Sequence, residues 1–144
     1  MRIRKKCSHC IECNVELNNE NAYKQSSCST LVNKCKDCCS RYNKSNRRRT
    51  RLKVIDGLGG KCECCGEDRE PFLTLDHINN DGAQHRKSLW PGQMNGWRTG
   101  SQVVYREVIK QGFPRDKYRI LCYNCNCALK TYPICPHKLP PVNK

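Results

Sequence analysis

An aspartate and a histidine stand side by side at the end of a short apolar stretch, where they could do chemistry. Residues 72–75 alternate in the manner of a β-strand and lead directly into Asp76 and His77. A neutral imidazole takes up a proton near neutral pH, and a carboxylate binds divalent cations. Neighbouring side chains on a strand point to opposite faces, so the two groups could serve separately as base and metal ligand. The pair predicts a hydrolytic site.

Cysteine is abundant, with 14 among 144 residues, and many of the thiols form Cys-x-x-Cys pairs. Paired thiols in a reducing compartment are metal ligands more often than disulfides. No apolar run follows the charged residues at positions 1–6, so we expect neither a secretory signal nor a membrane span. The expected location is the cytoplasm, of the host cell if the gene is phage-encoded. A disulfide-rich secreted mini-protein that has lost its signal is the alternative, which the initiator Met and the repeated pairs disfavour.

Eight of the cysteines form two quartets that suit tetrahedral zinc. Two Cys-x-x-Cys turns with the 21 residues 14–34 between them make the first, and two turns separated by the 56 residues 66–121 make the second. Both zinc ions are expected to be structural, because four thiolates leave no open coordination position. The ligands are Cys10, Cys13, Cys35 and Cys38 in the first quartet and Cys62, Cys65, Cys122 and Cys125 in the second.

The remaining thiols leave the choice of ligands open. They are spare thiols or alternative ligands: Cys7, Cys28 and Cys39 near the first quartet, and Cys64 and Cys127 near the second. Cys135 and His137 belong either to a further zinc site with Cys127 or to a solvated tail.

The composition indicates that metal must supply stability that a core would otherwise give. Hydrophobic residues make up 37% of the chain, with two Phe and two Trp, which is little apolar surface for this length. The net charge is +14. A basic excess favours a polyanionic partner, because contacts to phosphates release counterions. Together with the zinc-finger spacing, the charge predicts nucleic-acid binding.

We expect two zinc-organised lobes joined by a basic connector: an N-terminal zinc finger over residues 1–45, the connector over 46–60 and a second domain over 61–144. Residues 36–56 contain neither proline nor glycine, so they favour a helix that ends at Gly57. The connector carries a run of arginines that we expect to contact the DNA backbone. The predicted DNA-binding residues are Arg47, Arg48, Arg49, Arg51 and Lys53, and Arg86 in the second lobe.

The second lobe mixes short strands and helices, which makes the chain a small, zinc-stabilised α+β protein. Residues 79–82 are typical of a turn. Residues 101–111 predict an amphipathic helix that Ser101 caps and Gly112 stops. Residues 118–121 predict a second strand, and a short helix is expected after Cys122 as far as Lys130.

The motif Leu75-Asp76-His77-Ile78, followed by Leu121-Cys122-x-x-Cys125-Asn126, resembles the HNH, or ββα-metal, endonucleases of phage type. The resemblance covers residues 60–137, and residues 7–45 look like the small zinc finger that often precedes such a nuclease. It implies a ββα-metal (HNH) nuclease core that hydrolyses phosphodiester bonds, with His77 as the base that activates water. It also implies that Asp76 and Asn126 hold a catalytic Mg²⁺ or Mn²⁺ through their oxygens.

The chain departs from the family pattern at one position. Many members carry an Asn five residues before the third zinc cysteine, where it orients the catalytic histidine; here that position is Lys117. Asn79, two residues after His77, is the candidate to orient the imidazole instead. His85 is either a contact to the scissile phosphate and the next candidate for the base, or an exposed turn histidine.

We therefore expect a metal-dependent HNH endonuclease that nicks DNA or cuts both strands, with DNA as its partner and a homodimer as an open possibility. The alternative is a non-catalytic zinc-finger protein that binds DNA or RNA. It explains the charge and the cysteines but not the combination of Asp76, His77 and Asn126. A translation-linked RNA-binding protein is a third hypothesis, for which the aromatic pair of RNA-recognition modules is lacking. No membrane association is expected.

Overall fold

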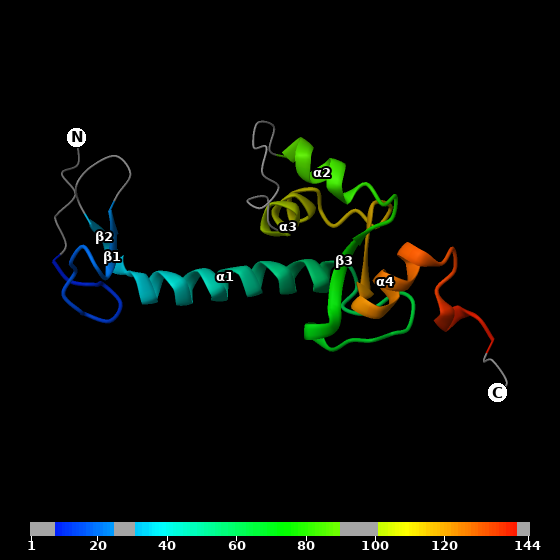
Figure 1. Cartoon of the computed structure of the whole chain (residues 1–144), viewed down its shortest axis with the longest axis horizontal. Helices are drawn as coiled ribbons and strands as arrows, with labels where there is room; N and C mark the ends of the chain where they lie inside the picture. The colour runs from blue at the N-terminus through cyan, green and yellow to red at the C-terminus, as the bar shows by residue number, and fades with distance from the viewer. Residues whose placement is uncertain (1–7, 25–30, 90–100, 141–144) are drawn as a thin grey trace. The chain divides into compact units, whose positions relative to one another are not determined.

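The computed structural model describes residues 8–24, 31–89 and 101–140 (Figure 1). Within these ranges the chain is a small α+β protein with two two-stranded sheets and four α-helices. It divides into two compact units, Met1–Arg48 and Arg49–Lys144, and the boundary falls inside the segment expected as a connector. Two of the alternative zinc ligands, Cys7 and Cys28, lie outside the described residues. None of the helices in these ranges has the length and apolar composition that a membrane crossing requires.

The first unit is built around cysteines. Strand β1 (Ala22–Lys24) pairs antiparallel with β2 (Leu31–Cys35), so that Ala22 lies opposite Cys35. Its buried cluster is small and consists mainly of thiols: Cys10, Leu17, Ala22, Cys35 and Cys38. Two aliphatic side chains among five members are too few to hold a fold of this size together by hydrophobic burial. The unit therefore needs its sulfur ligands to be joined by metal.

Helix α1 spans Lys36–Gly57, which confirms the helix expected over 36–56. It ends where glycines take up left-handed backbone angles, with φ of 109° at Gly59 and 74° at Gly60. Its last turns are anchored by packing, since Val54 and Ile55 belong to the core of the second unit. An otherwise polar helix is thus stabilised mainly at its C-terminal end.

The second unit alternates short helices and strands. Strand β3 pairs antiparallel with β4 from Leu73 opposite Cys122 to His77 opposite Tyr118. One face of this hairpin is buried with Leu73 and Ile120 fully covered, and α4 lies against the hairpin (Figure 1). The elements are η1 (Glu70–Phe72), β3 (Leu73–His77), α2 (Gly82–Leu89), α3 (Ser101–Lys110), β4 (Tyr118–Cys122), α4 (Tyr123–Thr131) and η2 (Pro136–Lys138).

Most of these elements agree with the predictions, and α2 is the exception. The strands at 73–77 and 118–122 and the helices at 101–110 and 123–131 lie where they were expected. Residues 82–89 were not expected to be helical, because the turn signal at 79–82 hid the helix that begins at Gly82. As a result His85 is not an exposed turn residue: it lies on α2 and is half-buried.

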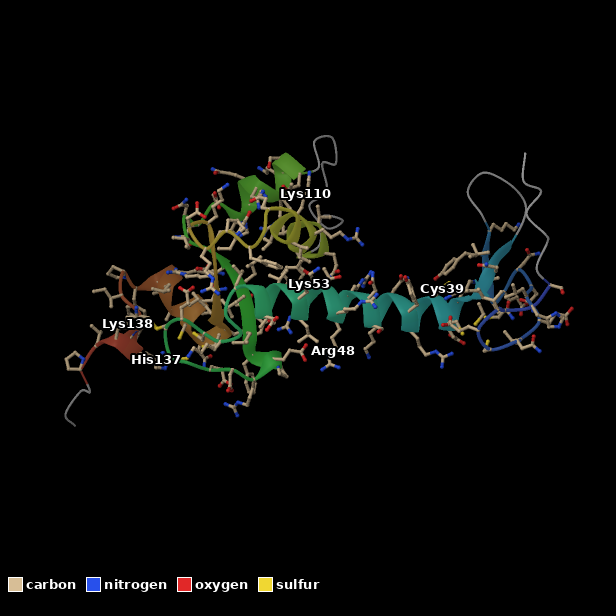
Figure 2. The ribbon with its side chains drawn as sticks, turned by 180° about the vertical axis from the view of Figure 1, so that it is seen from behind. Cys39, Arg48, Lys53, Lys110, His137 and Lys138 are labelled. Atoms are coloured by element: carbon tan, nitrogen blue, oxygen red, sulfur yellow. The ribbon has the colours of Figure 1, made fainter. Side chains whose placement is uncertain are left out.

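Arg51 ties α1 to the beginning of the hairpin. Its Nη1 donates to Glu70 Oε1 at 2.9 Å, and its Nη2 donates to the carbonyl oxygens of Glu70 at 2.8 Å and Leu73 at 2.6 Å. Its side chain is 21% exposed, so the guanidinium is used inside the protein. The expectation that Arg51 contacts DNA is therefore replaced by a structural role. Lys53, two residues along α1, is exposed (Figure 2).

Candidate metal centres and histidine site

Both quartets begin with the same turn. In the first, Cys10 N–H donates to Val15 O and Asn14 N–H to Cys10 O, each at 2.8 Å. In the second, Cys62 N–H donates to Glu67 O at 2.8 Å and Gly66 N–H to Cys62 O at 2.9 Å. The residue after the last cysteine of each turn is left-handed, with φ of 56° at Asn14 and 80° at Gly66. Asn and Gly adopt this conformation most readily, which explains why they stand there.

Both quartets also end in the same way, with a strand that stops at one cysteine and a helix that begins at the next residue. Strand β2 ends at Cys35 before α1, and β4 ends at Cys122 before α4. In each case the cysteine three residues on donates its N–H back to that sulfur, from Cys38 at 3.5 Å and from Cys125 at 3.4 Å. Backbone N–H groups at a helix N-terminus favour thiolate, which is the form that binds metal.

The sulfurs within each quartet are assembled. The ligand atoms of each quartet lie within 4.8 Å of one another, so both predicted groups could hold structural zinc. The sulfurs of Cys13 and Cys35 are 3.7 Å apart, as are those of Cys65 and Cys122. Among the described residues all the cysteines are free of disulfides. Cys39, the remaining described alternative ligand in the first unit, instead directs its thiol to Lys34 O at 3.9 Å.

The thiols of each quartet differ in acidity. Hydrogen bonds to the backbone at Cys35 lower the pKa of Cys10 to about 6. The Arg41 guanidinium, 3.1 Å from Cys38 Sγ, lowers the pKa of that thiol, but burial and the neighbouring thiols outweigh it and raise the value to about 12. Burial likewise raises the pKa of Cys125. Four thiols packed together resist losing all their protons, so metal binding must displace protons and its affinity rises with pH.

A third group of ligand atoms adjoins the second quartet. It consists of Cys64, Cys125, Cys135 and His137, again with all four atoms within 4.8 Å of one another. Cys127, which was considered as a partner of Cys135, is exposed and lies outside this group. The sequence offered one signal that could have pointed to Cys64, which is its place inside the second knuckle between Cys62 and Cys65.

The structure brings together His77 and His85. His77 Nε2 lies 3.0 Å from His85 Nδ1, and Tyr118 Oη lies 3.5 Å from the same nitrogen. The His77 ring meets the Tyr118 ring edge to face, with centroids 5.0 Å apart. A Cβ on Gly82 would lie 3.0 Å from His77 Nδ1, so glycine lets α2 begin this close to the imidazole. Tyr118 was expected only as a strand residue, and its contact with the histidines depends on the β3–β4 register.

Burial lowers the pKa of His77 below its ordinary value, and the charge of the nearby His85 lowers it further. Arg86, exposed on α2, acts in the same direction, while Asp81 opposes it. A half-buried imidazole among cationic neighbours is therefore neutral at physiological pH. A neutral imidazole can accept a proton.

The oxygen ligands expected for a divalent cation are less well assembled. Asp76 Oδ2 accepts a hydrogen bond from Arg119 Nε at 2.8 Å, and the Asp76 side chain is 11% exposed. Among the described residues, no hydrogen bond joins Asp76 to Asn126, which lies in the first half of α4. The donor types suit Mg²⁺, but a cation at Asp76 has to compete with the Arg119 guanidinium.

Asn79 is exposed in the turn after β3, and within the described residues no hydrogen bond links it to His77. The His77 backbone is held instead by Asn80, whose N–H donates to His77 O at 3.0 Å, and its ring by His85 and Tyr118. Lys117, at the position where the family carries Asn, accepts a hydrogen bond from Ile78 N–H through its carbonyl at 3.0 Å. The orienting contacts of the imidazole thus come from elements other than Asn79.

Comparisons of this chain with protein-family models, with curated proteins and with solved structures find no significant match.

Proposed function

We propose that this protein is a metal-dependent HNH endonuclease that hydrolyses phosphodiester bonds in DNA, with structural zinc in both cysteine quartets. The observation that carries the proposal is the environment of His77, a neutral imidazole at the end of a hairpin strand with a carboxylate as its neighbour in sequence. An exposed histidine would be partly protonated near pH 6.5, whereas burial and His85 keep His77 in the form that accepts a proton.

The arrangement of the hairpin supports a division of roles between its two faces. His77 lies on the face of Leu73 and Tyr118, whereas Asp76 lies on the face of Arg119, because strand side chains alternate. Arg119 lines a pocket together with Leu129 of α4, and Asn126 is one helical turn from Leu129. Asp76 and Asn126 therefore belong to facing surfaces of hairpin and helix. They would hold Mg²⁺ or Mn²⁺ through their oxygens, and the ion would neutralise charge on the phosphate.

Cationic side chains near His77 suit a phosphodiester substrate. Arg86 follows His85 on α2, is exposed, and is close enough to influence the pKa of His77. Lys53 is exposed on α1 (Figure 2). We assign both to contacts with the DNA backbone, which attract DNA of any sequence and weaken as salt rises. The run of arginines at 47–49 remains a predicted contact of the same kind.

The test is nicking of supercoiled plasmid by the full-length protein with Mg²⁺ or Mn²⁺ and with EDTA. His77→Ala should slow cleavage by about 10²–10⁴-fold, as expected for loss of a general base, while zinc content and DNA affinity stay unchanged. His9→Ala, at an exposed histidine of the first unit, is the matched control and should cleave at the wild-type rate. Asp76→Ala and Asn126→Ala should raise the metal concentration needed, and excess metal should rescue them but not His77→Ala.

A second candidate function is a non-catalytic zinc protein that binds nucleic acid. Two observations favour it: the Arg119–Asp76 ion pair occupies the carboxylate, and His85 occupies His77 Nε2. Under this hypothesis Asp76 and His77 are structural, and wild-type protein binds plasmid but leaves it intact with every divalent ion tried. A wild-type protein that cuts, together with a His77→Ala variant that does not, would exclude it.

A further inference from the structure

The ligand group of Cys64, Cys125, Cys135 and His137 shares one residue with the second quartet. Cys125, in the first turn of α4, belongs to both groups. Cys64 comes from the knuckle, and Cys135 and His137 come from the segment around η2, where Figure 2 labels His137. Seven residues from three parts of the second unit thus converge on one buried sulfur.

The distances in this group are those of ligands around one tetrahedral ion. Zinc bonds of about 2.3 Å to sulfur and 2.0–2.1 Å to nitrogen imply edges of about 3.8 Å between sulfurs and about 3.6 Å from sulfur to nitrogen. His137 Nδ1 lies 3.5 Å from Cys135 Sγ and 3.2 Å from Cys125 Sγ. In the second quartet, Cys65 and Cys122 sulfurs are 3.7 Å apart. The third group therefore has the spacing of the quartet beside it.

Hydrophobic burial does not explain why this segment folds back. Ile134 and Leu139 remain 53% exposed each, whereas Cys135 between them is only 2% exposed. A segment drawn in by the hydrophobic effect would bury its larger aliphatic side chains first. Here the thiol is buried, and the imidazole two residues later directs Nδ1 at two sulfurs. What holds the segment is its ligand atoms.

We propose that the second unit binds two zinc ions in one cluster, in which the thiolate of Cys125 bridges them. One ion is held by the second quartet and the other by Cys64, Cys125, Cys135 and His137. The six thiols give up their protons on binding, and the cluster then carries two net negative charges with a neutral imidazole. Arg119 and Lys138 line the pocket next to Cys64 and Cys135, so positive charge lies close by. Both ions would be structural, because each has four protein ligands.

The first experiment counts zinc in the full-length protein by native mass spectrometry. The double variant Cys135→Ser/His137→Ala should bind one zinc fewer per chain than wild type. Cys127→Ser is the matched control, since Cys127 is an exposed α4 thiol outside every ligand group, and it should keep the wild-type count. An equal count in wild type and the double variant would show that the third group binds no ion of its own.

The second experiment tests the bridge and needs no variant. In protein loaded with ¹¹³Cd, two cadmium ions that share the Cys125 sulfur should show a resolved cadmium–cadmium coupling in the NMR spectrum. A cadmium protein whose signals are all uncoupled would overturn the bridged cluster, even if the ion count is as expected. The coupling should also disappear in the Cys135→Ser/His137→Ala variant, which leaves the second quartet complete.

Discussion

Arg51 offers a prediction that separates stability from DNA binding. Arg51→Ala removes two hydrogen bonds to backbone carbonyls and one ion pair at once. Hydrogen bonds from a charged donor contribute about 1.5–3 kcal/mol each, and the lower end applies here because the guanidinium is partly exposed. The ion pair with Glu70 adds less than about 1 kcal/mol at this exposure. We expect Arg51→Ala to lower the free energy of unfolding of the second unit by about 3–4 kcal/mol.

The assay is hydrogen–deuterium exchange at the β3 and β4 amides in zinc-containing buffer, because these amides report the second unit alone. Arg51→Lys should recover less than half of the loss, since an ammonium group cannot reach all three acceptors with the planar geometry of a guanidinium. Lys53→Ala, at an exposed position two residues along the same helix, should change stability by less than about 0.5 kcal/mol.

The reasoning is refuted if Arg51→Ala and Lys53→Ala have the same stability. The three bonds of Arg51 would then contribute nothing net, and Arg51 would be available for the DNA contact first expected of it. In that case its effect should appear in the salt dependence of DNA binding instead, where each lost phosphate contact reduces the slope by about 0.9.

Four further predictions concern packing, geometry, pH and metal. Gly57→Ala should destabilise the second unit, although alanine is favoured in helices by about 1 kcal/mol, because the new Cβ would lie 2.4 Å from the Phe113 ring; thermal unfolding measures the sign, and a stabilised variant would contradict it. Gly82→Ala should reduce plasmid cleavage more than it reduces stability, because its Cβ crowds His77 Nδ1 at 3.0 Å; equal cleavage by variant and wild type would count against His77 as the base. Because the pKa of His77 is lowered from 6.5 in the folded state, the unfolded chain binds the extra proton first, so its contribution to stability is complete above pH 6.5 and is lost as pH falls below that value. Comparing unfolding of wild type and His77→Gln over this range isolates the effect, which should be missing from the variant. Chelation of zinc should unfold both units, as circular dichroism would report, and retention of the native spectrum with the metal removed would show that the quartets are not structural.

The parts of the fold that the sequence predicted are those set by local spacing. A Cys-x-x-Cys turn brings two sulfurs together whatever the rest of the chain does, so both quartets could be recognised from residue numbers alone. Helix α1 could be predicted because residues 36–56 lack glycine and proline. Strand β3 showed its alternation in the residues just before Asp76.

What could not be predicted depends on pairing between distant segments. The ion pair of Asp76 with Arg119 exists because the antiparallel register places the two residues opposite each other. The contact of His77 with His85 requires α2, whose few apolar residues give no helical period. Cys135 reaches Cys64 only after η2 folds back, and no spacing rule connects residues so far apart.

The second unit is the first unit's metal motif with a longer insertion, and this explains how zinc and the histidine site are linked. The same knuckle and the same strand-to-helix step enclose 21 residues in the first unit and 56 in the second. The longer insertion contains β3 and α2, which carry His77 and His85. Cys122 fixes one end of the hairpin opposite Leu73, and His77 stands at the other end, four residues or about 13 Å along the strand. Because a strand that loses its anchored end can also lose its register, and a slip of one residue turns every side chain to the other face, the position of the imidazole depends on the intact sulfur cluster.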